Sequence, residues 1–183
     1  MIGELQKTIR CDGRDYAIRT DYRIALRCMV AFQDPDVPEW AKWEIMLRLL
    51  IIDYEEIKDV NTAIKECVYY LNASRETPKQ MKKAKLYDWE QDEQMIFSAV
   101  NAVAKCEIRD KSYHWWTFLG WFNEIGEGMF STVVSIRNKK NKHKKLEKYE
   151  EEFYRDNRDV IELKHKISAE QKANMERINA MYQ

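Results

Sequence analysis

Hydrophobic residues along most of the chain recur at intervals of three and four, which places them on one face of a helix. A first run begins after a capping residue, Thr20 or Asp21, and ends at about Phe32. Its apolar stripe consists of Tyr22, Ala25, Leu26, Met29 and Val30. A second run follows Pro38 over residues 39–52, with a predicted stripe of Trp40, Trp43, Leu47 and Leu50. The pattern predicts an amphipathic helix for each run.

Further along the chain, the same spacing predicts helices over residues 60–71, 89–104, 113–125 and 129–137. Asp59 is the expected cap of the first of these helices, and Ser112 is the expected cap of the third. A capping box led by Asp88 opens the second. The charged segment 147–156 is expected to be helical, as is a final segment that opens with another capping box at Ser168.

Residues 8–19 instead alternate with the two-residue period of a strand. Ile9 and Cys11 fall on one side of the first strand, and Tyr16 lies on the return strand. Between the strands, Asp12-Gly13 suits a type I′ turn, because both central residues of that turn have positive φ. An isolated hairpin is marginal in water, so this one is expected to pack on the rest of the chain.

The composition fits a mainly α-helical protein. Of 183 residues, 45% are apolar and 34% are charged, and only 5 Gly and 3 Pro are present for turns. We expect a compact domain of about six to eight helices with a small N-terminal β-hairpin. Residues 1–137 would form this domain, and 138–183 a basic linker and charged C-terminal helices, whose packing on the same domain is left open. The polar residues 72–87 are expected to form an exposed loop.

The sequence predicts a cytoplasmic protein, located in the cytosol of a cell. The longest uninterrupted apolar run is residues 49–52, which is far too short to cross a membrane, and no secretory signal is visible. The four cysteines are scattered without a Cys-x-x-Cys pair, so reduced, packed thiols are expected. With 31 basic and 31 acidic side chains, the net charge of zero excludes a uniformly basic nucleic-acid binder but not a local patch.

The most aromatic segment is residues 114–122, HWWTFLGWF. On a helix, Trp115 and Phe118 share one face, and Trp116 and Trp121 lie on its two flanks. One interpretation is a central helix that is buried nearly all round. The other is a protein-binding surface, because Trp is enriched at binding hot spots. The candidate protein-binding residues are then Trp115, Trp116, Phe118, Trp121 and Phe122.

Groups suited to catalysis are sparse. His114 would need a partner such as Asp92, but a buried Asp92 satisfied by a cap, an arginine or the histidine is the favoured interpretation. Acidic clusters such as residues 55–59 resemble metal-binding carboxylates, yet helix caps and solvated faces produce the same pattern. No phosphate-binding loop, dinucleotide fingerprint or zinc-protease motif occurs. We therefore expect no enzyme, no cofactor and no metal site.

Basic residues are concentrated between positions 137 and 148, where seven basic side chains and one acid give a local charge of +6. The candidate basic patch consists of Arg137, Lys139, Lys140, Lys142, Lys144 and Lys145. Such a patch can bind phosphates in a salt-dependent way, but it lacks aromatic residues for base stacking. A solvated linker or a patch for an acidic partner is favoured over nucleic-acid binding.

Four stretches together resemble a known family. These are CDGRDYAI (11–18) with TDYR (20–23), YDWEQD (87–92), HWWTF (114–118), and Ile136-Arg137 with the lysine-rich stretch that follows. They are similar in kind and order to small tail-morphogenesis proteins of long-tailed phages and prophages of Gram-positive bacteria. The resemblance covers about residues 5–155. Members of this family are encoded beside the tape-measure protein and treated as tail assembly chaperones or their companions.

The resemblance implies a helical, cytosolic protein that binds the tape-measure protein and other tail assembly proteins and keeps the tape-measure protein soluble. The alternatives are a nucleic-acid-associated phage protein that uses residues 137–148, and a structural tail component that stays in the particle. A homo-oligomer is left open, and no membrane partner is expected.

Overall fold

The chain begins with a two-stranded antiparallel hairpin in the computed structural model, which describes residues 3–75, 84–164 and 177. Strand β1 (Thr8–Cys11) pairs with β2 (Arg14–Ala17), and Ile9 lies opposite Tyr16. Asp12 and Gly13 have φ angles of 51° and 76°, as the predicted type I′ turn requires. The predicted hairpin is therefore confirmed.

The hairpin is anchored on α3 (Val60–Leu71), which follows the helical turn η1 (Tyr54–Glu56). The carboxylate of Asp12 accepts hydrogen bonds from the backbone N–H groups of Lys58 and Asp59, at 2.8 and 2.9 Å. The side chain of Asp59 in turn caps α3, as predicted. The turn residue thus fixes the hairpin to the start of this helix.

Helices α1 (Tyr22–Gln33) and α2 (Glu39–Leu50) pack against each other. Asp21 caps α1 by accepting the Arg23 N–H at 2.9 Å. The predicted stripe of α2 is confirmed at Leu47 and Leu50, which are buried, but it is wrong at Trp40, which is 70% exposed. The helix instead turns Met46, a residue on the flank of that stripe, into the core.

Helices α4 (Glu93–Ala104) and α5 (Trp115–Asn123) both begin later than predicted. The carboxylate of Asp88 accepts the N–H groups of Glu90 and Gln91, but this cap closes only a turn, and α4 starts after Asp92. Ser112 donates its hydroxyl to Asp21, which leaves His114 as the cap of α5. In both cases the predicted cap forms a hydrogen bond outside the helix.

Helix α6 (Met129–Asn141) is four residues longer than predicted, and α7 (Lys148–Asp156) and α8 (Arg158–Ile161) follow it. The predicted domain boundary at residue 137 therefore falls inside a helix. Lys139 and Lys140 lie in the last turn of α6, where positive charge is favourable beside the negative end of the helix dipole. Residues 138–141 are thus helical and not a linker.

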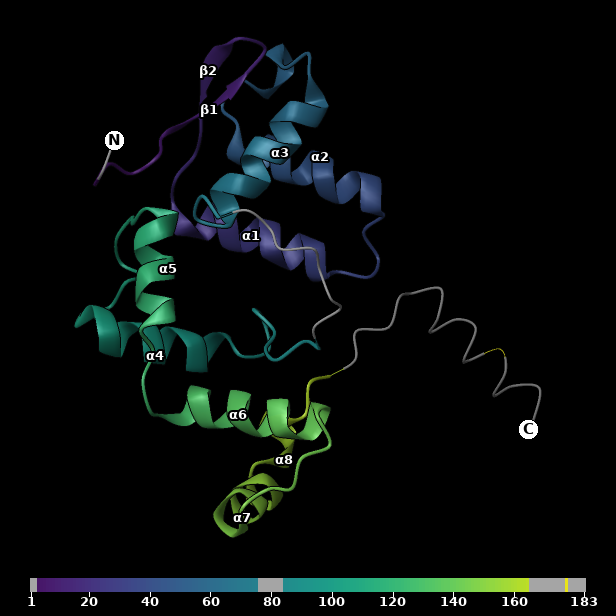
Figure 1. Cartoon of the computed structure of the whole chain (residues 1–183), viewed down its shortest axis with the longest axis vertical. Helices are drawn as coiled ribbons and strands as arrows, with labels where there is room; N and C mark the ends of the chain where they lie inside the picture. Colours follow the sequence, from purple (N-terminus) through teal and green to yellow (C-terminus); the bar gives the residue numbers. More distant parts are fainter. Residues whose placement is uncertain (1–2, 76–83, 165–176, 178–183) are drawn as a thin grey trace.

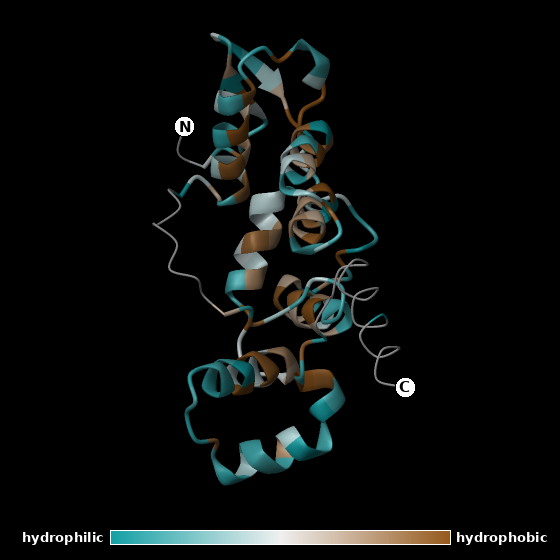
Figure 2. Cartoon of the chain, turned by 90° about the vertical axis from the view of Figure 1, so that its right-hand side faces the viewer, coloured by the Kyte–Doolittle hydropathy of each residue, from teal (hydrophilic) through white to brown (hydrophobic). Residues whose placement is uncertain are grey.

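The helices form a stack (Figure 1). The hairpin, α2 and α3 lie at one end, α1, α5 and α4 occupy the middle, and α6, α8 and α7 lie at the other end. Figure 2 shows that α7, at the far end, is mostly hydrophilic. Over the residues that the structure describes, the protein is mainly α with eight α-helices and one hairpin, as expected.

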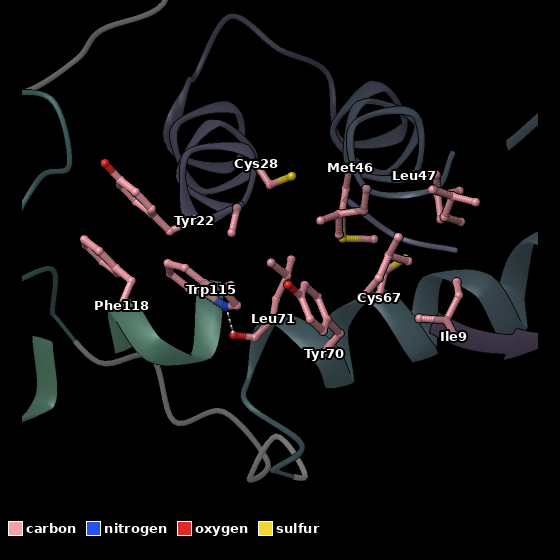
Figure 3. Close-up of a cluster of buried hydrophobic side chains, with 14 of the residues drawn as sticks. Ile9, Tyr22, Cys28, Met46, Leu47, Cys67, Tyr70, Leu71, Trp115 and Phe118 are labelled. Atoms are coloured by element: carbon pink, nitrogen blue, oxygen red, sulfur yellow. Dashed lines mark hydrogen bonds between the residues drawn. The ribbon is translucent and has the colours of Figure 1, made fainter. Parts of the chain in front are cut away.

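The main core is continuous from the middle of the stack to the hairpin (Figure 3). Tyr22 of α1 stacks on Phe118 of α5 with ring centroids 5.0 Å apart. The indole Nε1 of Trp115 donates to the Leu71 carbonyl at the end of α3, at 2.9 Å. These contacts join α1, α3 and α5, so the elements that surround α5 are fixed by its aromatic residues.

Two predictions fall wholly or partly outside the described residues. The final helix opened by Ser168 belongs to 165–176 and 178–183, and the predicted loop 72–87 includes 76–83. Of the described part of that loop, residues 72–75 follow the end of α3 and residues 84–87 lead into the Asp88 turn.

Candidate protein-binding site

The structure places the aromatic face of α5 inside the core. Trp115 is 1% exposed and Phe118 is fully buried, so neither side chain is available to a partner in the folded protein. Two of the five candidate binding residues are therefore structural, as the buried-helix interpretation predicts. They hold α1 and α3 against α5.

The other three candidates are half-buried and already have partners within the chain. The indole Nε1 of Trp116 donates to the Tyr70 carbonyl at 2.9 Å. Trp121 packs edge-on against Tyr113 with centroids 4.9 Å apart, and Phe122 packs against Trp89 at 5.3 Å. Each of these rings exposes only part of its surface to solvent. Protein binding through these three residues stays a prediction.

A second apolar surface lies between α1 and the segment that leads into α4. It is a groove of about 520 Å³. Its apolar lining consists of Leu26, Val30, Ala31, Val37, Trp89, Ile96 and Phe97. Val30 and Trp89 are only partly buried, whereas Ile96 and Phe97 close the base from α4. We call this surface the α1–α4 groove.

Charged side chains flank the α1–α4 groove, with both signs present. Arg23 and Arg27 line it from α1, Asp34 lines it from the residue after α1, and Glu90 and Glu93 line it from the opposite side. The guanidinium of Arg23 is held by the carboxylate of Asp21 at 2.7 Å. In the part of the chain that the structure describes, Arg27 and Glu93 have no ion pair. The groove therefore combines an apolar floor with a basic side chain on the α1 edge, Arg27, and acidic side chains on the α4 edge.

The sequence pattern did not reveal this groove. Leu26 and Val30 belong to the predicted stripe of the first helix and were expected in the core together with Tyr22 and Ala25. The structure buries Tyr22 and Ala25 almost completely but leaves Leu26 and Val30 only partly buried. The only sign of the groove in the sequence is the width of this apolar stripe, which has more residues than one neighbouring helix can cover. The residues of the opposite wall lie about sixty positions later in the sequence, so no local pattern links the two walls.

Arg137 is not part of a surface patch. Its guanidinium is buried and forms a two-pronged ion pair with the carboxylate of Asp92, at 2.6 and 3.0 Å. Its remaining donors bond the backbone carbonyls of Leu86, Val160 and Ile161, at 3.0, 2.8 and 2.6 Å. All donors of the guanidinium are thereby satisfied, and the basic patch loses its first member.

Lys139 also turns inward, toward Glu150 of α7. Its ammonium lies 2.7 Å from both oxygens of the nearly buried carboxylate of Glu150. Hydrogen bonds from Lys139 lower the pKa of Glu150 below its usual value. Lys140 is exposed but lies 3.8 Å from Glu162, and Lys142, Lys144 and Lys145 are exposed. The patch is thus reduced to the lysines of the loop between α6 and α7.

His114 has a structural environment. Its Nδ1 accepts the Trp116 N–H at 3.1 Å, and its Nε2 lies 2.7 Å from the carbonyl oxygen of Gln6. A neutral ring with the proton on Nε2 satisfies both contacts. The expected buried Asp92 is paired with Arg137 rather than with this histidine. His114 therefore joins the N-terminal segment to the start of α5.

The thiols of Cys28 and Cys67 lie in the core. Burial raises the pKa of Cys28 and of Cys67 to about 12, which keeps both thiols protonated. Over the described ranges, the four cysteines are free and no group of three or more His, Cys, Asp and Glu side chains is placed to hold a metal ion. Within the same ranges, no helix is long and apolar enough to span a bilayer.

Comparison with known proteins identifies the family. The model of the family described as Bacteriophage Gp15 protein matches residues 1–163 of this chain. The match extends beyond the resemblance noted above, since it includes α8, whose backbone receives the Arg137 guanidinium. Neither the curated proteins nor the solved structures that were searched gave a match. The chain therefore belongs to the Bacteriophage Gp15 protein family.

Proposed function

We propose that this phage protein is a tail assembly chaperone that binds the tape-measure protein and keeps it soluble in the host cytosol while the tail is assembled. The observation that carries the proposal is the α1–α4 groove. A groove between two helices with an apolar floor and charged edges suits the binding of another polypeptide. Membership in a phage protein family and the resemblance to tail-morphogenesis proteins support the choice of partner.

The proposal gives the protein a binding role and no chemistry of its own. A tape-measure protein is a very long helical chain with apolar stripes, which aggregates unless those stripes are covered. A chaperone for such a chain must release it when the tube polymerises. A half-open groove that buries only a few side chains at a time suits a partner that is bound and then given up.

Co-expression tests the proposal directly. Fragments of the tape-measure protein from the same phage or prophage would be produced alone and together with the full chain. We expect the fragments to be more soluble in its presence and to co-purify with it. The variant Val30→Glu, which places a charge in the floor of the groove, should reduce both effects. Unchanged solubility together with no co-purification would refute the proposal.

A matched control separates loss of the groove from loss of the fold. Lys65→Glu changes an exposed residue on α3, outside the groove. It should leave solubility and co-purification as they are with the native chain. Thermal unfolding of both variants followed by tryptophan fluorescence would show that they fold. If Lys65→Glu were as harmful as Val30→Glu, the groove would not be the binding surface.

A further inference from the structure

We propose that the α1–α4 groove binds an amphipathic helix that carries acidic side chains along one flank of its apolar stripe and basic side chains along the other. This inference rests on the function proposed above and specifies the chemistry of the bound segment. It follows from the walls of the groove, from its floor and from the charges on its edges.

The walls favour a helix over an extended strand. An extended partner gains affinity from backbone hydrogen bonds to an open sheet edge. The groove is formed by α1 and by the Asp88 turn with α4, whose backbone groups are largely bonded within those elements. Recognition must therefore come from side chains. The twelve residues of α1 span about 18 Å, which corresponds to about three turns of a bound helix.

The floor fits a stripe of apolar side chains. Leu26, Val30 and Val37 lie along α1 and the segment after it, and Trp89 lies opposite. These residues are only partly buried in the free protein, so a bound helix would remove further apolar surface from water. Residues spaced three and four apart on the partner would meet this floor.

The edges set the charges of the partner. Arg27 projects from α1, while Glu93 projects from the first turn of α4. Of the other charges that line the groove, Arg23 pairs with Asp21, and Asp34 lies just beyond the end of α1, where its carboxylate accepts the backbone N–H of Asp36. Glu90 adds a second acid on the side of Glu93. A helix with acids on both flanks would meet Glu93 with like charge, and one with bases on both flanks would meet Arg27 with like charge. A helix with one acidic flank and one basic flank places an opposite charge beside Arg27 and beside Glu93.

Opposite edges also determine the direction of the bound helix. A helix with one acidic and one basic flank can be laid in the groove either way round, but only one direction places its acids beside Arg27. The reverse direction places like charges together on both edges. The groove should therefore bind such a helix in one orientation.

Three designed peptides test the inference. Each has about three heptads with the same leucine stripe, and the flanks carry Glu and Lys, Glu on both sides, or Lys on both sides. Fluorescence anisotropy would measure their binding to the full chain at low and at high salt. We expect the mixed peptide to bind most tightly, by about two- to fivefold for each charge pair, with a smaller margin at high salt. If no peptide binds, or if all three bind equally, the inference fails.

A variant with the charge of one edge reversed shows whether the order of affinities comes from the groove or from properties of the peptides, such as their helix content. In Arg27→Glu both edges are acidic, so the peptide with Lys on both flanks should become the tightest ligand. Lys65→Glu introduces the same change of charge away from the groove and should preserve the native order. An unchanged order in Arg27→Glu would overturn the inference. Circular dichroism would show that both variants keep their helical content.

The outcomes also separate this inference from the proposed function. Tape-measure fragments that stay soluble with the native chain, combined with peptide binding that ignores flank charge, would reject the inference alone. Peptides that follow the expected order, combined with fragments that remain insoluble, would reject the tape-measure protein as the partner and keep the groove as a site for helices.

Discussion

The buried ion pair between Asp92 and Arg137 gives the sharpest prediction about stability. The two side chains are 0% and 5% exposed, and they lie 45 positions apart in the sequence. They connect the start of α4 to α6, and through the Arg137 bonds to Val160 and Ile161 they also hold α8. The loss of either partner should therefore destabilise the protein strongly.

The expected magnitude follows from burial. Asp92→Leu leaves a buried guanidinium without its counter-ion, which costs about 3 to 5 kcal/mol of unfolding free energy. Arg137→Met leaves the Asp92 carboxylate unpaired and three backbone carbonyls without a donor, so its cost should be at least as large. The double variant removes both charges together and should cost less than the sum of the single changes.

Urea unfolding followed by tryptophan fluorescence would measure these free energies. Arg158→Met is the matched control, since it removes an arginine from the exposed pair with Glu162 and should cost about 1 kcal/mol or less. A cost below about 1 kcal/mol for Asp92→Leu would refute the reasoning. Additive effects in the double variant would refute it as well, because they would mean that the two charges do not interact.

Three further outcomes are expected. Trp115→Ala should cost about 3 to 5 kcal/mol by urea unfolding, because it empties a core site, and a loss below about 1 kcal/mol would contradict its burial. Burial raises the pKa of Asp21, but hydrogen bonds from Arg23 and Ser112 outweigh this effect and lower the pKa from 3.8 to about 2. Its contribution to stability is therefore complete above about pH 5 and declines as the pH falls through 4 toward 2, and Asp21→Asn should flatten unfolding curves measured across this window. If nucleic acid is a partner, replacement of Lys142, Lys144 and Lys145 by Gln should weaken binding to DNA and reduce its salt dependence in a titration, whereas native binding that is insensitive to salt would exclude these lysines.

Local features of the fold could be predicted from the sequence because their causes lie within a few residues. Asp12-Gly13 needs only its own backbone preference to form the turn. Asp21 and Asp59 cap helices whose first N–H groups are two or three residues away. Periodicity located α1, α2, α3 and α6 because a helix that packs on one side must place apolar residues on that side.

The exact starts of α4 and α5 could not be predicted, because partners distant in the sequence hold the residues that precede them. The carboxylate of Asp92, which accepts the Asp88 N–H, also binds Arg137, 45 positions away, and the Ser112 hydroxyl donates to Asp21, 91 positions away. A capping motif indicates which hydrogen bond a side chain can form, but the residues that surround it in the folded protein determine which bond it does form.

The sequence by itself determined a mainly helical protein with one hairpin, a helix rich in aromatic residues and membership in a phage protein family. Only the tertiary structure decided which charges are neutralised and which apolar residues stay open to solvent. Arg137 belongs to a basic run along the chain, yet a carboxylate 45 positions away makes it part of the interior. Val30 belongs to a core stripe, yet it lines a groove because the wall opposite comes from α4. Burial and pairing depend on segments distant in the sequence, and no local pattern records where those segments meet.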